Sequence, residues 1–436
     1  MNLTKGSKIV LEKLNNNNFK GYVVGGACRD YILGKEVYDI DVTTNATPDQ
    51  VLTVFKDYKV YKTGLKHGTV TVNIDGENIE ITTFRKDGDY LNNRKPSSVL
   101  FVDDLKEDLL RRDFTINSIC FNESQGFIDL FNGIQDCKDK IIRTVGSADA
   151  RFSEDALRIL RALRFASTLS FNIEDETAKA IINNRELLKN ISKERIYSEL
   201  IKILLGDNVE YVLLNFKQVF FTLFSDFELC DNFDQQSKYH IYDVYTHIVK
   251  SISYAEKDKV VRLALLFHDI KKPYCFSVDE KGSGHFYTHQ EKSANKALEI
   301  LNDLKVDNKT KNQVYFLIKY HDFGIEPTKT NIKLWLNKYG VEYLKNLMKV
   351  KIADAKAHSQ NFIGYRLSQA ENGLKLIDQI LLNNECFSLK YLKIKGEDLI
   401  KKGYKGKEIS DKLDSLLQDV INEKVENDRE VLLKLI

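Results

Sequence analysis

Two aspartates separated by one residue, Asp39 and Asp41, have the type and spacing to do chemistry. In a β-strand, residues two apart point to the same face, so both carboxylates would converge on one point. Two hard oxygen ligands suit Mg²⁺, which binds through one or two carboxylates together with substrate phosphates. Glu80 is either a third carboxylate of this site or a solvent-facing strand residue. The pattern therefore predicts a Mg²⁺ site for attack of a hydroxyl on a bound phosphate.

A double glycine lies between an expected strand, residues 21–24, and an expected helix. The letters GGACRD occupy residues 25–30. Glycines let a backbone approach a phosphate closely, and a helix start offers unpaired N–H groups and a positive dipole end. Arg29 would add a forked cation for triphosphate oxygens. Most double glycines are only tight turns, so the phosphate-binding interpretation of this motif depends on the aspartate pair that follows it.

A second polar motif, RRDFTIN, occupies residues 111–117. Arg111 is expected to contact the phosphate or the sugar of a nucleotide. Arg112 and Asp113 would either join it or form a structural ion pair with each other, and the sequence leaves both interpretations open.

The letters SEDALR at residues 153–158 predict a helix that begins near Ser153, with acidic residues in its first turn. Asp155 and Arg158 are three residues apart and therefore neighbours on the helix surface, and Arg161 and Arg164 continue the row. A carboxylate only accepts hydrogen bonds and a guanidinium only donates them. Such a pair would admit cytosine and adenine, whose amino donor lies beside a ring-nitrogen acceptor, and reject uracil and guanine. The alternative is a local ion pair.

A third group of residues lies in the middle of the chain, where residues 240–358 hold seven of the eight histidines. His247, His268-Asp269 and Asp354 fit the H…HD…D pattern of HD-superfamily phosphohydrolases. Imidazole and carboxylate ligands together suit a divalent transition metal or Mg²⁺ that activates water. Two more histidines would extend the site toward a second metal, His289 and His321.

The elements that position these residues change in type near residue 145. Before it, short β-like segments at residues 21–24, 69–74 and 79–84 alternate with turns, and Asp75-Gly76 predicts a hairpin. After it, apolar residues recur at helical spacing. The expected fold is α+β, with a head built on a small β-sheet and an elongated all-helical remainder. The expected domains are a head (1–145), a helical neck (146–235), an HD domain (236–360) and a helical tail (361–436).

Composition narrows the class of protein. The chain has 436 residues, of which 43% are hydrophobic and 29% charged, as in folded globular proteins. The net charge of only +2 means that contact with nucleic acid must come from local basic surfaces. The six cysteines include no CxxC pair, and no apolar stretch approaches the roughly 20 residues that span a bilayer. We therefore expect a cytoplasmic protein without a membrane partner.

Five motifs occur in one order: GGACRD, DID, HGTVTV, RRDFTIN and EDALR. In this order they resemble class II tRNA nucleotidyltransferases and bacterial poly(A) polymerases over roughly residues 20–205. The letters IKGEDLI and GYKG, at residues 394–400 and 403–406, resemble the C-terminal segment of bacterial CCA-adding enzymes. The resemblance implies a palm-like nucleotidyltransferase head, a neck that binds RNA, a tail that binds tRNA, and Mg²⁺ on Asp39 and Asp41. It also implies nucleotide contacts by Gly26, Arg29, Arg111, Asp155, Arg158, Arg161 and Arg164.

The expected function is template-independent addition of CCA to tRNA 3′ ends from CTP and ATP, with a metal-dependent phosphohydrolase as a second activity. Residues 86–98 are expected to form a mobile loop, which CC-only relatives lack, so its presence favours A addition. Within the same class, A-only addition or poly(A) synthesis are the alternatives. From another class, the alternative is an HD-type phosphohydrolase whose head only binds nucleotide.

Overall fold

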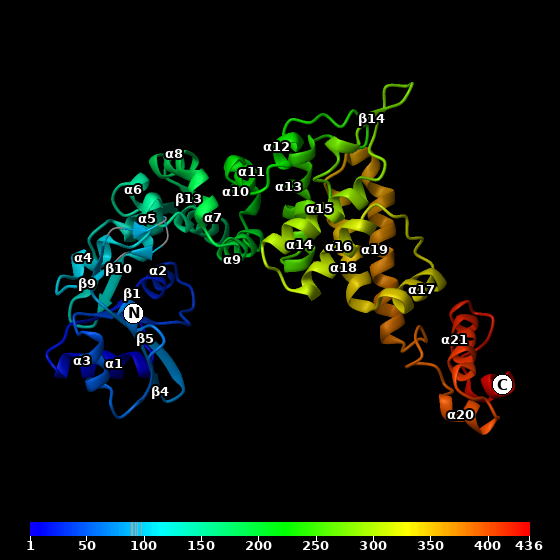
Figure 1. The fold of residues 1–436 in the computed structure, drawn as a ribbon, viewed down its shortest axis with the longest axis horizontal. Coiled ribbons are helices and arrows are strands. Elements are labelled where there is room, and N and C mark those ends of the chain that lie inside the picture. Colours follow the sequence, from blue (N-terminus) through cyan, green and yellow to red (C-terminus); the bar gives the residue numbers. More distant parts are fainter. Residues whose placement is uncertain (89, 92, 94, 97) are drawn as a thin grey trace. The chain divides into compact units, whose positions relative to one another are not determined.

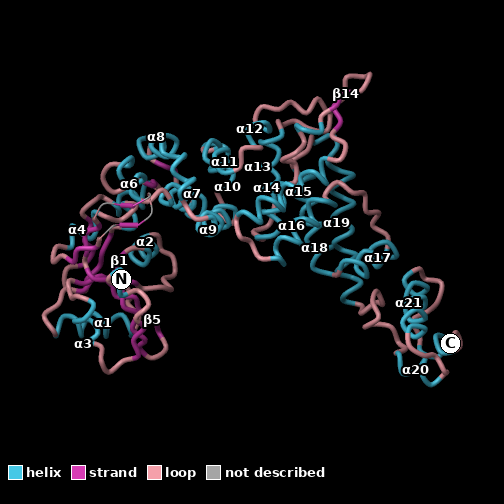
Figure 2. Tube along the Cα trace, in the orientation of Figure 1, coloured by secondary structure: helices cyan, strands magenta, loops and turns pink. Residues whose placement is uncertain are grey.

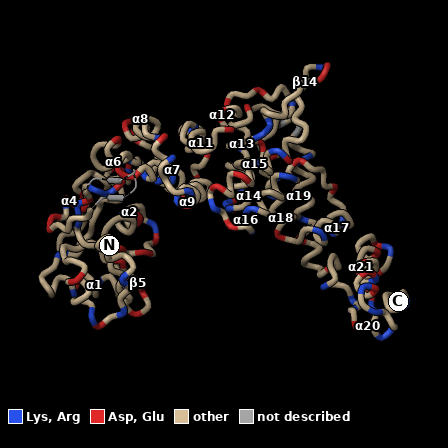
Figure 3. Tube along the Cα trace, in the orientation of Figure 1, with Lys and Arg blue, Asp and Glu red and all other residues tan. Residues whose placement is uncertain are grey.

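The computed structural model describes residues 1–88, 90–91, 93, 95–96 and 98–436, and its contacts separate into two compact units. The first unit is Met1–Leu223 and the second is Phe224–Ile436. Strands are concentrated in the first unit, whereas the second is built almost wholly of helices (Figures 1 and 2). Basic and acidic residues are interspersed along the chain in both units (Figure 3). The predicted α+β class, with a sheet-containing head followed by helices, is confirmed.

The head is organised around a seven-stranded sheet of order β11-β10-β1-β2-β5-β4-β3. Its middle is hydrophobic: Val23, Val42 and Ile81 on three neighbouring strands are fully buried. The strands are β1 (Gly21–Val24), β2 (Asp41–Thr44), β3 (Lys59–Tyr61), β4 (Thr69–Ile74), β5 (Glu77–Thr83), β10 (Ile119–Asn122) and β11 (Gly126–Asp129). The helices of the head are α1 (Lys5–Asn16), α2 (Gly26–Ile32), α3 (Pro48–Val54), α4 (Leu105–Leu110) and α5 (Gly133–Asp139).

The predicted hairpin between β4 and β5 is confirmed. Ile74 pairs with Glu77, and the two turn residues between them, Asp75 and Gly76, have φ of 53° and 92°. Positive φ at both central residues is what a tight hairpin turn requires, and an Asp-Gly step supplies it at low cost.

The expected loop after β5 is instead largely paired. β6 (Arg85–Asp87) pairs antiparallel with β9 (Val99–Phe101), and β7 (Tyr90–Leu91) pairs with β8 (Lys95–Pro96). Turn residues at 88–93 suggested a loop, but the flanking segments satisfy their backbone groups across a ladder. Asp89 and Asn92 lie outside the described residues. We call residues 85–101 the arm.

The neck completes the first unit with helices and one short pair of parallel strands. The helices are α6 (Ala148–Glu154), α7 (Leu157–Leu169), α8 (Asp175–Asn184), α9 (Lys193–Leu204), α10 (Val209–Asn215) and α11 (Lys217–Leu223), and the strands are β12 (Ile141–Ile142) and β13 (Asn172–Ile173). The predicted helix start at Ser153 is wrong, because Ser147 caps α6 earlier and Ser153 lies inside that helix. The chain leaves the helix at Asp155, whose side chain accepts a hydrogen bond from Leu157 N at the start of α7.

The second unit begins with short α12 (Phe227–Cys230) and is then dominated by longer helices. These are α13 (Val244–Tyr254), α14 (Lys259–Phe267), α15 (His289–Asp303), α16 (Asn308–Tyr320), α17 (Lys329–Tyr339), α18 (Val341–Lys356) and α19 (Gln360–Leu382). A small hairpin, β14 (Ser277–Val278) and β15 (Gly284–His285), lies between α14 and α15. The last segment, α20 (Gly396–Lys401), α21 (Lys407–Ile421) and α22 (Arg429–Leu433), has its own apolar cluster around Leu399, Leu417 and Ile421. Within the described residues, no helix combines the length and apolarity needed to cross a bilayer.

Candidate active site

Three carboxylates lie around the start of β2, a central strand of the head sheet. Asp41 opens β2, opposite Val24 of β1 and beside Glu80 of β5, and Asp39 lies two residues before it. Desolvation raises the pKa of Asp41, and the Glu80 and Asp39 carboxylates raise it further, while the Arg112 guanidinium acts the opposite way. The fold therefore holds several negative charges close together with little compensation. Asp39 lies before the strand rather than in it, a difference from the predicted geometry.

The double glycine forms a turn directly in front of α2. Gly25 has φ of 76°, a conformation that favours glycine, and Gly26 is the first residue of the helix. Arg29, one turn later, donates to Asp30 at 2.9 and 3.0 Å and to Asn117 Oδ1 at 2.8 Å. The GGACRD and RRDFTIN motifs are thus joined through an arginine and an asparagine.

The two arginines of RRDFTIN are both held by Asp108, a fully buried carboxylate of α4. Asp108 accepts from Arg111 at 2.7 and 3.0 Å, from Arg112 at 3.3 Å and from Thr43 of β2 at 3.1 Å. Burial alone would raise the pKa of Asp108, but Arg112 and Arg111 lower it below its ordinary value. An ideal Cβ placed on Gly25 would lie 3.4 Å from Arg112 Nη1, so Arg112 faces the glycine turn.

This arrangement corrects the alternative in which Arg112 and Asp113 pair with each other. Arg112 pairs with Asp108, and Asp113 accepts from Arg161 Nε of α7 at 2.7 Å. The i,i+4 spacing from Asp108 to Arg112 on one helical turn explains the first pair, whereas the second spans 48 residues and has no local signal.

The junction between α6 and α7 carries the residues expected to read a base. Asp155 pairs with Arg195 of α9 at 3.1 Å and does not form the local pair with Arg158. Arg158 is buried and donates to Glu154 at 2.6 Å and to the carbonyl oxygens of Arg151 and Arg111 at 3.1 and 2.8 Å. Farther along α7, Arg164 pairs with Glu199 at 3.3 Å.

The buried Asp113–Arg161 pair predicts acid sensitivity of the neck. Burial alone would raise the pKa of Asp113, but Arg161 and Asn117 overcome it and lower the pKa to about 2. Because the pKa of Asp113 is depressed in the folded state, its ionised carboxylate stabilises the fold at pH values above the ordinary pKa. This stabilisation, about 2 kcal/mol, is lost as the pH falls from about 4 to about 2. Asp113→Asn is expected to flatten this dependence in the hydrogen exchange of α7 amides, corrected for intrinsic rates. Equal slopes in both proteins would contradict it.

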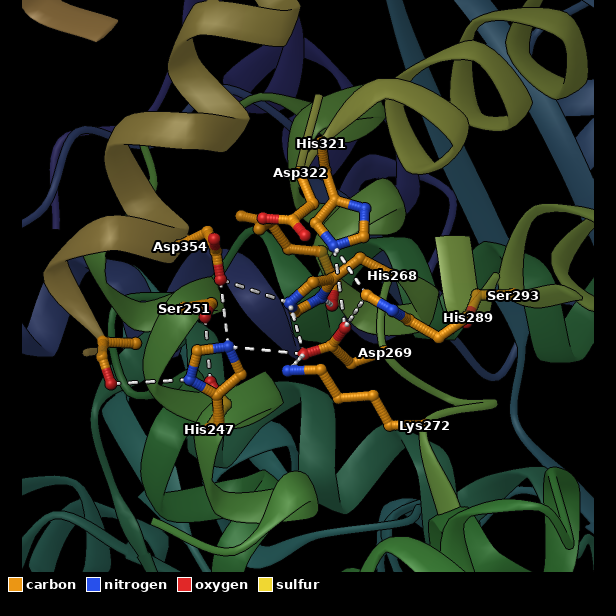
Figure 4. A network of polar contacts seen from close by, with 12 residues as sticks. His247, Ser251, His268, Asp269, Lys272, His289, Ser293, His321, Asp322 and Asp354 are labelled. Atoms are coloured by element: carbon orange, nitrogen blue, oxygen red, sulfur yellow. Dashed lines mark hydrogen bonds and ion pairs between the residues drawn. The ribbon is translucent and has the colours of Figure 1, made fainter. Parts of the chain in front are cut away.

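In the second unit, four imidazoles converge on Asp269 (Figure 4). His247, His268, His289 and His321 are buried, and each directs Nε2 toward a carboxylate of the cluster. Each Nδ1 lies near a backbone carbonyl oxygen, which fixes the ring and leaves the Nε2 lone pair facing the centre. These oxygens belong to Ala357, Leu265, Phe286 and Ile318, at 3.4, 2.7, 2.6 and 2.7 Å respectively.

The two carboxylate oxygens of Asp269 face different pairs of histidines. Oδ2 lies 3.5 and 3.2 Å from Nε2 of His247 and His268, and Oδ1 lies 3.3 and 3.6 Å from Nε2 of His289 and His321. Asp354 Oδ1 lies 2.9 Å from His247 Nε2, so all four residues predicted as ligands are brought together.

The cluster opens into a cavity of about 650 Å³, where polar groups other than the ligands also lie. Lys272 Nζ lies 2.7 Å from Asp269 Oδ2, and His240, His358 and Arg366 line the same cavity. The histidine-rich sequence signalled the cluster, but the roles of His240, His358 and Lys272 were not predicted, because neither spacing nor residue type singled them out.

Three stretches of the chain match known domain families. Residues 21–143 match the poly(A) polymerase head domain. Residues 170–218 match the RNA- and SrmB-binding region of polymerase A, and residues 285–436 match tRNA nucleotidyltransferase domain 2. The resemblance predicted from the five motifs is confirmed.

Curated relatives of this chain include CCA-adding enzymes. The chain is 47% identical to the Staphylococcus aureus enzyme over 208 residues, and 48% identical to that of Lactobacillus delbrueckii over 207 residues. Each match covers 48% of this chain and 52% of the relative, so the chain matches about half the length of these curated relatives. A solved Bacillus stearothermophilus CCA-adding enzyme in complex with CTP has a TM-score of 0.71 and 27% identity, covering 98% of this chain and 95% of that one.

The carboxylates of the head domain fit a divalent cation. Desolvation and the neighbouring Glu80 and Asp39 carboxylates raise the pKa of Asp41, and Arg112 offsets this only in part. Among the described residues, groups of three metal-binding side chains with ligand atoms within 4.8 Å of one another occur only in the histidine cluster. The head domain carboxylates are therefore more open, as expected where substrate phosphates complete the coordination.

Proposed function

We propose that this protein adds CCA to tRNA 3′ ends from CTP and ATP, with Mg²⁺ held by Asp39 and Asp41. The observation that carries the proposal is the carboxylate group beside Arg112 and the glycine turn, inside a poly(A) polymerase head domain. Bound Mg²⁺ would supply the charge that activates the RNA 3′-hydroxyl and stabilises the leaving pyrophosphate. Arg29, in the last turn of α2, and Arg112 would orient the triphosphate. Arg111, whose guanidinium is bound by Asp108, remains a proposed contact of the nucleotide.

The test uses three RNAs: tRNA without CCA, tRNA ending in CC, and an unrelated RNA, each with labelled CTP or ATP. CCA addition predicts C incorporation into the first RNA and A incorporation only into the second. A incorporation into the second alone, with no C added to the first, would instead identify an A-adding enzyme. Long A tracts on all three would identify a poly(A) polymerase.

Base choice is assigned to Asp155 and Arg158 at the α6–α7 junction. In this structure both are bound by other groups of the protein, so reading a base requires Asp155 to exchange Arg195 for an amino group of the nucleotide. That pair lies near the surface, where ion pairs contribute little, so the exchange costs little free energy.

Asp155→Ala is expected to reduce discrimination against UTP and GTP by about tenfold or more, because one position on the base edge is no longer read. The measurement is kcat/KM for each of the four nucleotides. Arg195→Ala is the matched control: it frees Asp155 and should preserve discrimination. An equal loss for all four nucleotides in Asp155→Ala would mean that the residue supports the fold or binds phosphate.

We assign to the arm the switch from adding C to adding A. Asn93 in the arm donates to Ser153 O at 2.6 Å, and its carbonyl accepts from Ala156 N at 3.1 Å, so the arm contacts the junction that carries Asp155. Replacing residues 86–98 by a short Gly-Ser link is expected to spare C addition and to reduce A addition by about tenfold or more. Equal losses with tRNA lacking CCA and tRNA ending in CC would indicate a general lid.

A second candidate function, a metal-dependent phosphohydrolase, is favoured by one specific observation in the histidine cluster. His268 Nε2 and both oxygens of Asp269 are buried and make no hydrogen bond of good geometry. Buried polar atoms without well-directed hydrogen bonds are costly even beside ionic neighbours such as Lys272, and convergent imidazole lone pairs beside carboxylates suit a divalent transition metal or Mg²⁺. His247, His268, Asp269 and Asp354 would hold one ion, and His289 and His321 with the other oxygen of Asp269 would hold a second. Bound metal would activate water for phosphoester hydrolysis.

A further inference from the structure

One aromatic ring lies among three of the arginines assigned to the nucleotide. Phe165 of α7 is 8% exposed, and Phe114 of the RRDFTIN motif packs against it edge-on, with ring centroids 5.8 Å apart and planes at 83°. The guanidinium carbons of Arg29, Arg161 and Arg164 lie 5.2, 5.5 and 4.2 Å from the centroid of Phe165. The ring is thus the common neighbour of cations from two different motifs.

Each of these guanidiniums is also held by a carboxylate on its other side. Arg29 is bound by Asp30, Arg161 by Asp113, and Arg164 by Glu199. These three carboxylates come from α2, from the RRDFTIN motif and from α9, so no single carboxylate holds the three guanidiniums together. Phe165 is the element that the three cations share.

The chemistry of the ring explains why it suits this place. An aromatic face is electrostatically negative and attracts a cation within about 6 Å, more strongly where water is excluded. Phe165 can therefore hold like charges near one another without a fourth carboxylate, which would compete with phosphate for the same guanidiniums. A leucine of similar apolarity fills part of the volume but has no such quadrupole.

We infer that Phe165 is a positioning residue that holds Arg29, Arg161 and Arg164 in the arrangement that receives the nucleotide triphosphate. The inference rests on the proposed nucleotidyl transfer. Phe165 itself touches no substrate and acts through the guanidiniums. Loss of the ring lets each arginine follow its own carboxylate, so the cations that should meet the triphosphate together no longer do so.

The experiment compares Phe165→Leu, Phe165→Tyr and Phe152→Leu in the full-length protein. Phe165→Leu is expected to raise KM for both CTP and ATP about tenfold, with a smaller change in kcat. It should also weaken the salt dependence of CTP binding measured by calorimetry, since fewer cations face the phosphates together. Phe165→Tyr keeps the ring and should return KM to within about twofold of the unmodified protein.

Phe152→Leu removes a fully buried ring from the neighbouring helix α6 and reports the effect of lost core packing. It is expected to lower the melting temperature at least as much as Phe165→Leu while leaving KM unchanged. An unchanged KM and CTP affinity in Phe165→Leu, or an equal rise in Phe152→Leu, would overturn the inference. If the unmodified protein adds no nucleotide, the proposed function fails, and CTP affinity measured by calorimetry still decides the role of Phe165.

Discussion

Asp41→Ala is expected to lower the rate of nucleotide addition by at least about 100-fold, and Asp39→Ala to do the same. Both carboxylates are assigned to the cation that stabilises charge on the reacting phosphate, and Glu80 beside Asp41 would leave that cation only part of its ligand set. The measurement is single-turnover addition of CMP to tRNA lacking CCA. Activity of the double variant near that of the unmodified protein would refute the assignment.

The fold of Asp41→Ala should remain intact. A raised pKa means that the folded state disfavours the ionised form, so at neutral pH removing the charge is expected to leave the stability unchanged or slightly higher. Asp75→Ala, in the exposed β4–β5 turn, is the matched control and should retain full activity. A large drop in melting temperature for Asp41→Ala would show that lost activity reports unfolding rather than lost metal.

The second large effect is expected in the histidine cluster. His268→Ala combined with Asp269→Ala should abolish phosphate release from p-nitrophenyl phosphate and reduce bound metal to background, while CCA addition with Mg²⁺ survives. Removing both residues leaves neither proposed cation a complete ligand set, and the head domain carboxylates belong to the other unit. The measurements are metal content by mass spectrometry and hydrolysis with Ni²⁺, Co²⁺, Mn²⁺ and Mg²⁺.

The matched control for this variant is His285→Ala. His285 is a surface histidine that pairs with Asp279 at 2.9 Å, outside the group of residues assigned to metal. It should retain both metal and hydrolysis. If the unmodified protein binds no metal and releases no phosphate, the hydrolase proposal is wrong and the second unit serves as a scaffold.

Local patterns predicted those parts of the head that depend on neighbouring residues. The Asp75-Gly76 hairpin followed from turn chemistry, and β1 followed from a short apolar run before the double glycine. The predicted helix start at Ser153 was wrong because Ser147, which was not predicted as a helix cap, caps α6 six residues earlier. Capping signals identify candidates, but packing selects among them.

Partnerships between distant residues could not be predicted. Asp155 pairs with Arg195 across 40 residues and Asp113 with Arg161 across 48, and no spacing rule reaches that far. The four predicted ligands of the histidine cluster do meet, since the H…HD…D pattern carries that information. The orientation of each imidazole by a backbone carbonyl depends on where the helices end, which residue types do not reveal.

The buried carboxylate of Asp108 has a consequence for the order of folding. Its partners Arg111 and Arg112 are three and four residues away, so this fork closes a short loop at a small entropic cost. Asp41 lies beside Glu80 only after β2 and β5 have paired, and that pairing closes a much longer loop. Contacts between residues close in sequence form early, so Arg111 and Arg112 can pair with Asp108 before β2 and β5 pair. In a refolding chain, Arg111 and Arg112 would then already be bound by Asp108 when Asp41 and Glu80 come together.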